Sequence, residues 1–307
     1  MEAHPLTKVE RLQAVLRGER PDRPPVSLWR HFPVDDQTAE GLASATIAYQ
    51  KLFDFDFLKI TPASSYCLKD WGIKDQWLGN PEGTRQYEKR VIQTPQDWLR
   101  LPELNPHRGS LNEHLTCLKI LKKHYSGRLP YITTIFSPLS QARNLAGADR
   151  LLEHLRQYPE EVLAGLQKIT KTTRAFIECC LKTGIAGIFL AVQHAQESVL
   201  KIEEYQAFGR PFDLAVLEMV QDLWLNMLHI HGENIYFDNF LDYPIQVINW
   251  HDRKTAPTLG EGLQRFSGVV CGGLKQWDTL VLGTSNQVKA EAMDALAYTA
   301  GRDVVFG

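Results

Sequence analysis

Two histidines, His229 and His231, close the apolar run WLNMLHIHG at residues 224–232. Alternate residues of a β-strand project from the same face, with Cα atoms about 6.5 to 7 Å apart, so both imidazoles can converge on one ligand. Zinc accepts histidine nitrogen, cysteine sulfur or carboxylate oxygen, and a catalytic zinc keeps one coordination position open. The pair therefore predicts a metal site, or two imidazoles that hydrogen-bond a substrate.

Other reactive groups follow neighbouring apolar runs. They are Gln193 and His194 after residues 186–192, Asn249, His251 and Asp252 at the end of 244–250, and Cys271 within 266–274. Cys271, His251 or Asp252 could supply a third metal ligand, and we take Cys271 as the expected one. His231, His251 and Asp252 are candidates for proton transfer. Cys271 could instead be a buried, apolar side chain, and His194 could be a hydrogen-bonded residue of the protein interior with no role in a site. The sequence has no nucleophile elbow, phosphate loop or dinucleotide fingerprint.

Eight short apolar runs must position these groups. They are residues 25–29, 55–60, 131–136, 186–192, 224–232, 244–250, 266–274 and 303–307. Segments of helical period separate them, which predicts an α/β protein with a parallel sheet covered by helices. Eight such units predict a single-domain (β/α)8 TIM barrel over residues 1–307, with the reactive groups at the carboxyl ends of its strands. An open, doubly wound sheet is the alternative.

Capping boxes mark two of the helices: Thr7 with Glu10, and Thr284 with Gln287. Residues 61–110 are too long for a simple crossover, so we expect an insertion or lid after the second strand. The sequence stops at Gly307, directly after the eighth run. The last helix of such a barrel is therefore expected to be missing from this chain.

Composition limits the classes of partner. The 307 residues are 44% hydrophobic and 23% charged, with a formal net charge of −2, which argues against a nucleic-acid partner. The first residues lack the apolar core of a signal peptide and no stretch is long enough to span a membrane, so we expect a cytoplasmic protein without a membrane partner. The five cysteines form no CxxC pair, and we expect reduced thiols. The oligomeric state is not predicted.

Several segments together resemble the uroporphyrinogen decarboxylase superfamily. They are RLQAVLRGERPDRPPVSLW, IFSPLSQARNLAG, LHIHGEN, VVCGGL and GTSNQVKAEAMDALAYTAGRDVVFG, and they span nearly the whole chain. The resemblance implies a (β/α)8 barrel with its site at the carboxyl ends of the strands. Members include the haem-pathway decarboxylase, which uses no metal, and zinc-dependent methyltransferases that move a methyl group between a corrinoid and a thiol.

The chain departs from the decarboxylases of this superfamily. Of the two arginines that follow their first strand, only Arg30 in LWRHFPVDD has a counterpart. Their essential aspartate after strand two has no match in KITPASSY, and their tyrosine after strand three falls near Arg143. A net charge of −2 does not promise the basic cleft that a porphyrinogen would favour. Tetrapyrrole decarboxylation remains an alternative, with Arg30 binding a carboxylate and His231 protonating the intermediate.

The methyltransferases carry a His-x-Cys at the end of strand five and a distant cysteine after strand eight. His229 matches the histidine, His231 replaces the first cysteine, and the distant cysteine would lie beyond Gly307. We therefore expect zinc-assisted methyl transfer to a small thiol, with a corrinoid as co-substrate on a partner protein. The expected metal ligands are His229, His231 and Cys271; the expected substrate- or cofactor-binding residues are Arg30, Arg143, Gln193, His194 and Asn234. A non-catalytic barrel that binds a tetrapyrrole or corrinoid is a further alternative.

Overall fold

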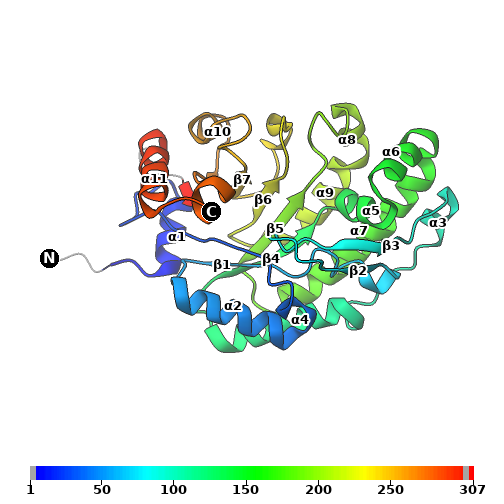
Figure 1. Cartoon of the computed structure of the whole chain (residues 1–307), viewed down its shortest axis with the longest axis horizontal. Coiled ribbons are helices and arrows are strands. Elements are labelled where there is room, and N and C mark those ends of the chain that lie inside the picture. The colour runs from blue at the N-terminus through cyan, green and yellow to red at the C-terminus, as the bar shows by residue number, and fades with distance from the viewer. Residues whose placement is uncertain (1–4, 300–303) are drawn as a thin grey trace.

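A computed structural model describes residues 5–299 and 304–307 of the chain and contains a curled, seven-stranded parallel sheet (Figure 1). The sheet order is β1-β4-β5-β6-β7-β8-β9, and β2 and β3 form a separate antiparallel hairpin. The strands are β1 Leu58–Ile60, β2 Lys74–Gln76, β3 Gln86–Lys89, β4 Tyr131–Phe136, β5 Gly187–Val192, β6 Met227–Ile230, β7 Val247–Trp250, β8 Val269–Gly272 and β9 Val304–Phe306.

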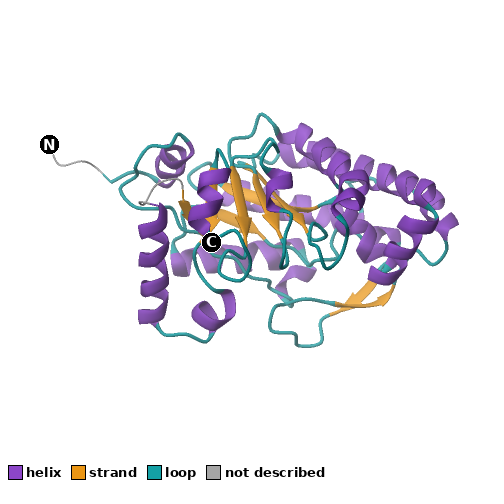
Figure 2. Ribbon diagram, turned by 90° about the horizontal axis from the view of Figure 1, so that it is seen from above, coloured by secondary structure: helices purple, strands orange, loops and turns teal. Residues whose placement is uncertain are grey.

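Helices surround the parallel sheet, which lies at the centre of the molecule, while the β2–β3 hairpin lies at its edge (Figure 2). The α-helices are α1 Lys8–Leu16, α2 Ala39–Phe53, α3 Pro95–Arg100, α4 Gly109–Tyr125, α5 Pro138–Ala146, α6 Ala148–Gln157, α7 Pro159–Leu181, α8 Ile202–Phe208, α9 Arg210–Leu217, α10 Leu259–Arg265 and α11 Ser285–Thr299. Short 3-10 helices cover 35–37, 69–71, 218–220 and 237–240, and a π-helix covers Gln276–Val281. None of the described helices combines the length and the apolar composition needed to cross a membrane.

The strands are apolar because both of their faces are covered. Every residue of β4, β5, β7 and β8 is buried. Their outer faces pack under amphipathic helices and their inner faces fill the space that the curled sheet encloses, which is the arrangement expected of helix-covered parallel strands. The predicted α/β class with a parallel sheet is confirmed.

The first predicted strand, residues 25–29, is the element that differs most from expectation. It forms only an isolated parallel bridge between Val26 and Phe306 of β9. The Val26 N–H donates to the Asp56 side chain, and its C=O accepts from the Asp56 backbone N–H, so a carboxylate replaces part of the ladder. Proline also removes the donor at Pro25. The segment nevertheless contacts both β9 and the two residues just before β1, and the curled sheet is consistent with a TIM-like barrel.

Local signals locate the helix starts. Thr7 and Glu10 satisfy each other's backbone donors at the start of α1, as predicted. Thr284 and Gln287 make the same reciprocal bonds before α11. The predicted strand at residues 303–307 appears as β9, with residue 303 outside the described residues.

Residues between β1 and α4 hold the β2–β3 hairpin and α3. Tyr66 and Trp71 in this region are buried and donate to backbone carbonyls of Thr134 and Pro102. The loop between the two hairpin strands instead carries exposed groups, among them Trp77 and Glu82. Most of the segment therefore packs as structure, and this loop, residues 77–85, is the part free to reach the barrel mouth.

Candidate active site

Three imidazoles meet at the carboxyl ends of two adjacent strands. His229 belongs to β6, His231 follows that strand, and His251 follows β7. Their ring centroids lie between 5.4 and 5.8 Å apart, and one nitrogen of each lies within 4.8 Å of the other two. We call His229, His231 and His251 the histidine cluster. Two of its members come from one strand end, and the third from its neighbour in the sheet.

A glycine allows the chain to turn directly after His231. Gly232 has a φ of +108°, which side-chain-bearing residues rarely adopt. A Cβ at this position would lie 2.2 Å from the Gln196 side-chain oxygen. The turn that positions His231 therefore requires glycine for both conformation and space.

Asn249 orients the deepest imidazole of the histidine cluster. The Asn249 Nδ2 donates to the Cys271 carbonyl at 2.9 Å, which points its Oδ1 toward His229. His229 Nδ1 lies 2.6 Å from that oxygen and must donate to it. The proton is thus on Nδ1, and the Nε2 lone pair is free to bind a ligand. Metal-binding histidines are commonly oriented in this way by a second hydrogen bond.

The surroundings of the histidine cluster lower the pKa values of its three imidazoles, of which His229 and His251 are partly buried and His231 is exposed. Burial lowers the pKa of His229 well below its usual value, with further lowering by the neighbouring His231 and His251. Burial also lowers the pKa of His251 to about 4 and lowers that of His231. A neutral imidazole offers the lone pair that a metal ion or a proton needs. Near neutral pH all three side chains are therefore potential ligands or bases.

The histidine cluster fits a divalent zinc ion. Tetrahedral zinc with Zn–N bonds of about 2.0 to 2.1 Å holds its nitrogens about 3.4 Å apart. The three nitrogens, within 4.8 Å of one another, require only a small closure of the rings to reach that spacing. Three protein ligands would leave the fourth position open, as in catalytic zinc sites.

Cys271, the expected third ligand, does not join this group; His251 does. Cys271 is fully buried in β8, where a Cβ on Gly307 would approach its Sγ to 2.6 Å and the Trp29 ring to 2.9 Å. Burial raises the pKa of its thiol above the usual range, which disfavours the thiolate that binds metal. The thiol therefore packs in the barrel interior beside Trp29, as its apolar alternative predicted.

Asp252 lies outside the histidine cluster as well. Its carboxylate accepts from the Gly273 backbone N–H at 2.9 Å and ties the chain after β7 to the end of β8. Burial raises its pKa to about 6, while the Gly273 hydrogen bond opposes that shift. This contact gives Asp252, predicted as a catalytic group, a role in holding the loop that carries His251.

Arg30 and Asn234 were predicted as site residues, but neither belongs to the histidine cluster. Arg30 is exposed, with its Nε donating to the His31 carbonyl and its guanidinium 5.8 Å from the Phe32 ring centre. Asn234 has a left-handed φ of 51°, and its backbone N–H donates to Thr255 Oγ1 at 2.9 Å. Asn234 therefore forms a turn, and neither residue lines the pocket described next.

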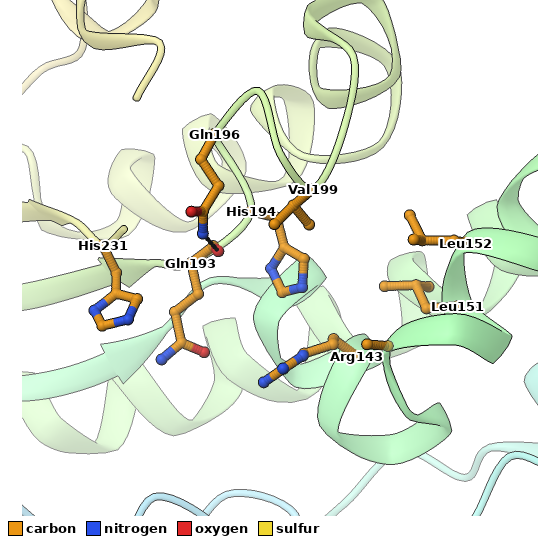
Figure 3. Close-up of a pocket in the computed structure, with 9 residues that line it drawn as sticks. Arg143, Leu151, Leu152, Gln193, His194, Gln196, Val199 and His231 are labelled. Carbon is orange, nitrogen blue, oxygen red and sulfur yellow. Dashed lines mark hydrogen bonds between the residues drawn. The ribbon is translucent and has the colours of Figure 1, made fainter. Parts of the chain in front are cut away.

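A pocket of about 210 Å³ adjoins the histidine cluster at His231. Arg143 from α5, Gln193 and His194 after β5, and Gln196 line its polar side, and their side chains point toward one another (Figure 3). The remaining lining residues are Ala148, Leu151, Leu152 and Val199. Four residues predicted from the sequence, Arg143, Gln193, His194 and His231, thus share one cavity.

His194 is the most constrained polar group in the pocket. It is 3% exposed, and its Nδ1 has no hydrogen-bond partner among the described residues. Burial, with the charge of Arg143, lowers its pKa to about 3. A buried, unpartnered ring nitrogen is costly unless a ligand binds it, so His194 is suited to a hydrogen bond with a bound molecule.

The 77–85 loop reaches across the mouth of the barrel. Trp277 Nε1, in the π-helix after β8, donates to Glu82 Oε1 at 2.8 Å. The charge of Glu82 raises the pKa values of His231 and His251, against the larger effect of burial, so the carboxylate lies close to the histidine cluster. This loop places one acidic group beside the three imidazoles.

Sequence reasoning missed three parts of this arrangement: Gln196, Glu82 and Trp277. It noted Asn249 at a strand end without a role. The alternation of β7 places Asn249 and His251 on the same face, and Asn249 pairs with His229 in the sheet register, so its contact could have been inferred. No comparable local signal connects Glu82 to Trp277, which are 195 residues apart.

Known proteins match both the sequence and the fold. The family model described as uroporphyrinogen decarboxylase (URO-D) matches residues 7–307. A methylated-thiol–coenzyme M methyltransferase from Methanosarcina mazei is 23% identical over 249 residues, covering 75% of this chain and 65% of that protein. This chain thus spans slightly less than two thirds of that relative's length.

Solved structures show the same fold. A methyltransferase from Methanosarcina mazei superposes with a TM-score of 0.85 at 18% identity, covering 98% of this chain and 92% of that one. A B12-independent methionine synthase from Shewanella sp. W3-18-1 gives a TM-score of 0.53 at 13% identity, covering 87% and 78%. At sequence identities of 18% and 13%, the similarity is evidence for a shared fold alone.

Proposed function

Because this chain belongs to the uroporphyrinogen decarboxylase family, we propose that it is a methyltransferase of that family, which transfers a methyl group from a corrinoid to a small thiol. The histidine cluster would hold zinc, and the pocket beside it would receive the organic substrate. The thiol–coenzyme M methyltransferase relative supports this class of reaction. The superfamily resemblance supports zinc as the metal and a corrinoid, carried on a partner protein, as the methyl donor.

One observation carries the proposal: the three imidazoles adjoin a pocket that has one polar and one apolar side, and His231 belongs to both. Asn249 holds His229 with its Nε2 free, so this ligand is oriented before a metal arrives. Pre-orientation reduces the entropy lost when a ligand set binds a metal. The donor set is therefore suited to an ion with an open position facing the pocket.

Zinc bound there would supply Lewis acidity that lowers the pKa of a thiol, so that its thiolate forms near neutral pH. In the overall reaction the thiol loses its proton, a carbon–sulfur bond forms, and the cobalt–carbon bond of the methylcorrinoid breaks with its electron pair left on cobalt. The product is a thioether.

The pocket residues would position the thiol substrate. Arg143 presents a guanidinium with no ion pair among the described residues, and His194 presents a buried ring nitrogen without a partner. Gln193 offers an amide on the same side (Figure 3). The Glu82 to Trp277 hydrogen bond would limit the access of water at the mouth. Together these groups can orient a polar substrate beside His231.

Metal content tests the proposal first. We expect about one zinc per chain by mass spectrometry, lost in a His229→Ala, His231→Ala double variant and retained in His124→Ala, which changes an exposed histidine on α4. The purified protein with methylcobalamin and coenzyme M should then form the methylated thiol. Metal-free parent protein, or no turnover with zinc bound, would overturn the proposal.

The alternative of tetrapyrrole decarboxylation has one observation in its favour. Arg30, Arg143 and Lys254 are exposed cations with no ion pair among the described residues. The charges of Arg143 and Lys254 both lower the pKa of His231, so these two cations lie near the mouth despite the net charge of −2. Release of carbon dioxide from uroporphyrinogen by the metal-free protein would favour this function, and binding of either ligand without turnover would favour a non-catalytic barrel.

A further inference from the structure

The pocket beside the histidine cluster has an apolar wall to which the proposed function gives no role. The wall is formed by Ala148, Leu151 and Leu152 of α6 and by Val199 of the loop before α8. Leu152 and Val199 are only partly buried and both line the pocket, so apolar surface faces its interior. A ligand that covers such surface with hydrocarbon gains free energy by removing it from water.

The sequence of α6 explains why this wall is apolar. Leu151 and Leu155 are buried, on the face of the helix that packs against the protein. Leu152 follows Leu151 by about 100° around the helix axis, which places it at the edge of that face. Gly147, with a φ of +96°, separates α5 from α6, and the turn lets Arg143 of α5 and Leu152 of α6 line the same pocket.

The two ends of the pocket differ in chemistry. His231 lies at one end, and Leu151 and Leu152 lie at the other (Figure 3). The Arg143 side chain extends toward Gln193 and away from the two leucines (Figure 3). A ligand whose sulfur lies beside His231 therefore passes the polar groups first and meets the leucines with its far end.

The pocket also limits the size and charge of the ligand. Its volume of about 210 Å³ is below the roughly 300 to 1,000 Å³ of sites for drug-sized ligands, so it suits a molecule with a short chain. None of the described residues that form the apolar wall is charged. A charged group at that end would lose its hydration without gaining a partner.

We propose that the methyl acceptor is a small thiol with a short alkyl tail, and that Leu151, Leu152 and Val199 bind this tail. The inference rests on the proposed function, because it assigns the end of the substrate opposite the sulfur. His194 lies between the two ends, and its buried Nδ1 has no hydrogen-bond partner among the described residues (Figure 3). The imidazole is therefore placed to bind a polar group between the sulfur and the tail.

Two thiols that differ only in the length of the tail test this assignment: N-acetylcysteamine and N-butanoylcysteamine. The second has two more methylene groups, and each methylene removed from water strengthens binding about fourfold. Calorimetric titration of the purified protein, with and without added zinc, should therefore show tighter binding of the butanoyl thiol by on the order of 15-fold. Zinc would act on the sulfur that both probes share, so the ratio of their affinities should be the same in the two titrations.

Two variants locate the tail. Leu152→Asn should lower the ratio of affinities to about fourfold or less, because an amide replaces the hydrocarbon that the tail covers. Val199→Thr keeps the shape of the side chain and adds a hydroxyl group, so it should also lower the ratio and is the milder change if Leu152→Asn does not fold. Leu99→Asn, at an exposed leucine of α3, should keep the ratio of the parent.

The outcomes also distinguish this inference from the function on which it rests. Equal binding of the two thiols by the parent would overturn the inference, as would an unchanged ratio in both Leu152→Asn and Val199→Thr. A ratio that depends on Leu152, without methyl transfer from methylcobalamin, would retain the apolar subsite and reject the methyltransferase. Methyl transfer to coenzyme M with equal binding of the two probes would do the reverse. Failure of the parent to bind either probe would reject the inference, and turnover with coenzyme M would then decide the proposed function alone.

Discussion

Asn249 Oδ1 accepts a hydrogen bond from His229 Nδ1 across the paired strands β6 and β7, at 2.6 Å. The same amide donates to the Cys271 carbonyl of β8, so three adjacent strands share one asparagine side chain. Because the Cys271 carbonyl accepts from Asn249 Nδ2, the Oδ1 atom of Asn249 faces His229. His229 Nδ1 donates to that oxygen, which leaves His229 Nε2 free to bind a ligand.

We expect Asn249→Ala to weaken zinc binding by about 10- to 100-fold, the usual effect of losing such an orienting contact. His229 would then be free to rotate and to change tautomer. Competition with a chromogenic chelator measures the zinc dissociation constant. Asn286→Ala, at an exposed position of α11, is the control, and an unchanged constant in Asn249→Ala would contradict the orienting role.

The third metal ligand is His251 according to the geometry of the site and Cys271 according to the prediction from the sequence, so two variants can distinguish them. We expect His251→Ala to lose most of the bound zinc and Cys271→Ala to retain it, because the thiol lies outside the group of converging nitrogens. Elemental analysis after dialysis measures both. Retention in His251→Ala together with loss in Cys271→Ala would restore the ligand set expected from the sequence.

Asp213 should make stability depend on pH. Burial raises its pKa from 3.8 to about 7, while a hydrogen bond from Tyr205 opposes the shift. The folded state therefore holds this proton more tightly than the unfolded chain, and the resulting stability is fully present below 3.8 and is lost as pH rises through about 7.

As the pH rises from about 4 to about 8, the parent loses this contribution and Asp213→Asn does not. We therefore expect the free energy of unfolding of the variant to increase relative to that of the parent by on the order of 2 to 4 kcal/mol over this range. Urea unfolding across this range measures the difference. The exposed Asp242→Asn provides the matched control. A difference that stays constant with pH would show that Asp213 does not titrate in this window.

The Glu82 to Trp277 contact should restrain the 77–85 loop. Trp277→Phe keeps an aromatic side chain but removes the Nε1–H that donates to Glu82. We therefore expect faster amide hydrogen exchange in this loop, with little change in β4 or β5. Mass spectrometry of the exchanged peptides measures it. Trp224→Phe is a control at a partly buried tryptophan, and equal exchange in both variants would indicate that the contact does not hold the loop.

The strands and helices could be predicted because their signals are local. The run 131–136 became β4 with the predicted bounds, and the capping boxes at Thr7 and Thr284 mark the starts of α1 and α11. The first strand was overestimated because the Asp56 side chain, 30 residues away, takes the Val26 N–H. A competition of that kind is invisible to periodicity.

Local patterns and ordered motifs were enough to predict the α/β class, the resemblance to the family and the convergence of His229 with His231. The position of His251 beside them, the inward packing of Cys271, the tautomer that Asn249 imposes on His229 and the place of Glu82 near the histidine cluster became apparent only from the folded chain. The physical reason is that bringing distant residues together depends on the curl and register of the sheet, which no local pattern specifies.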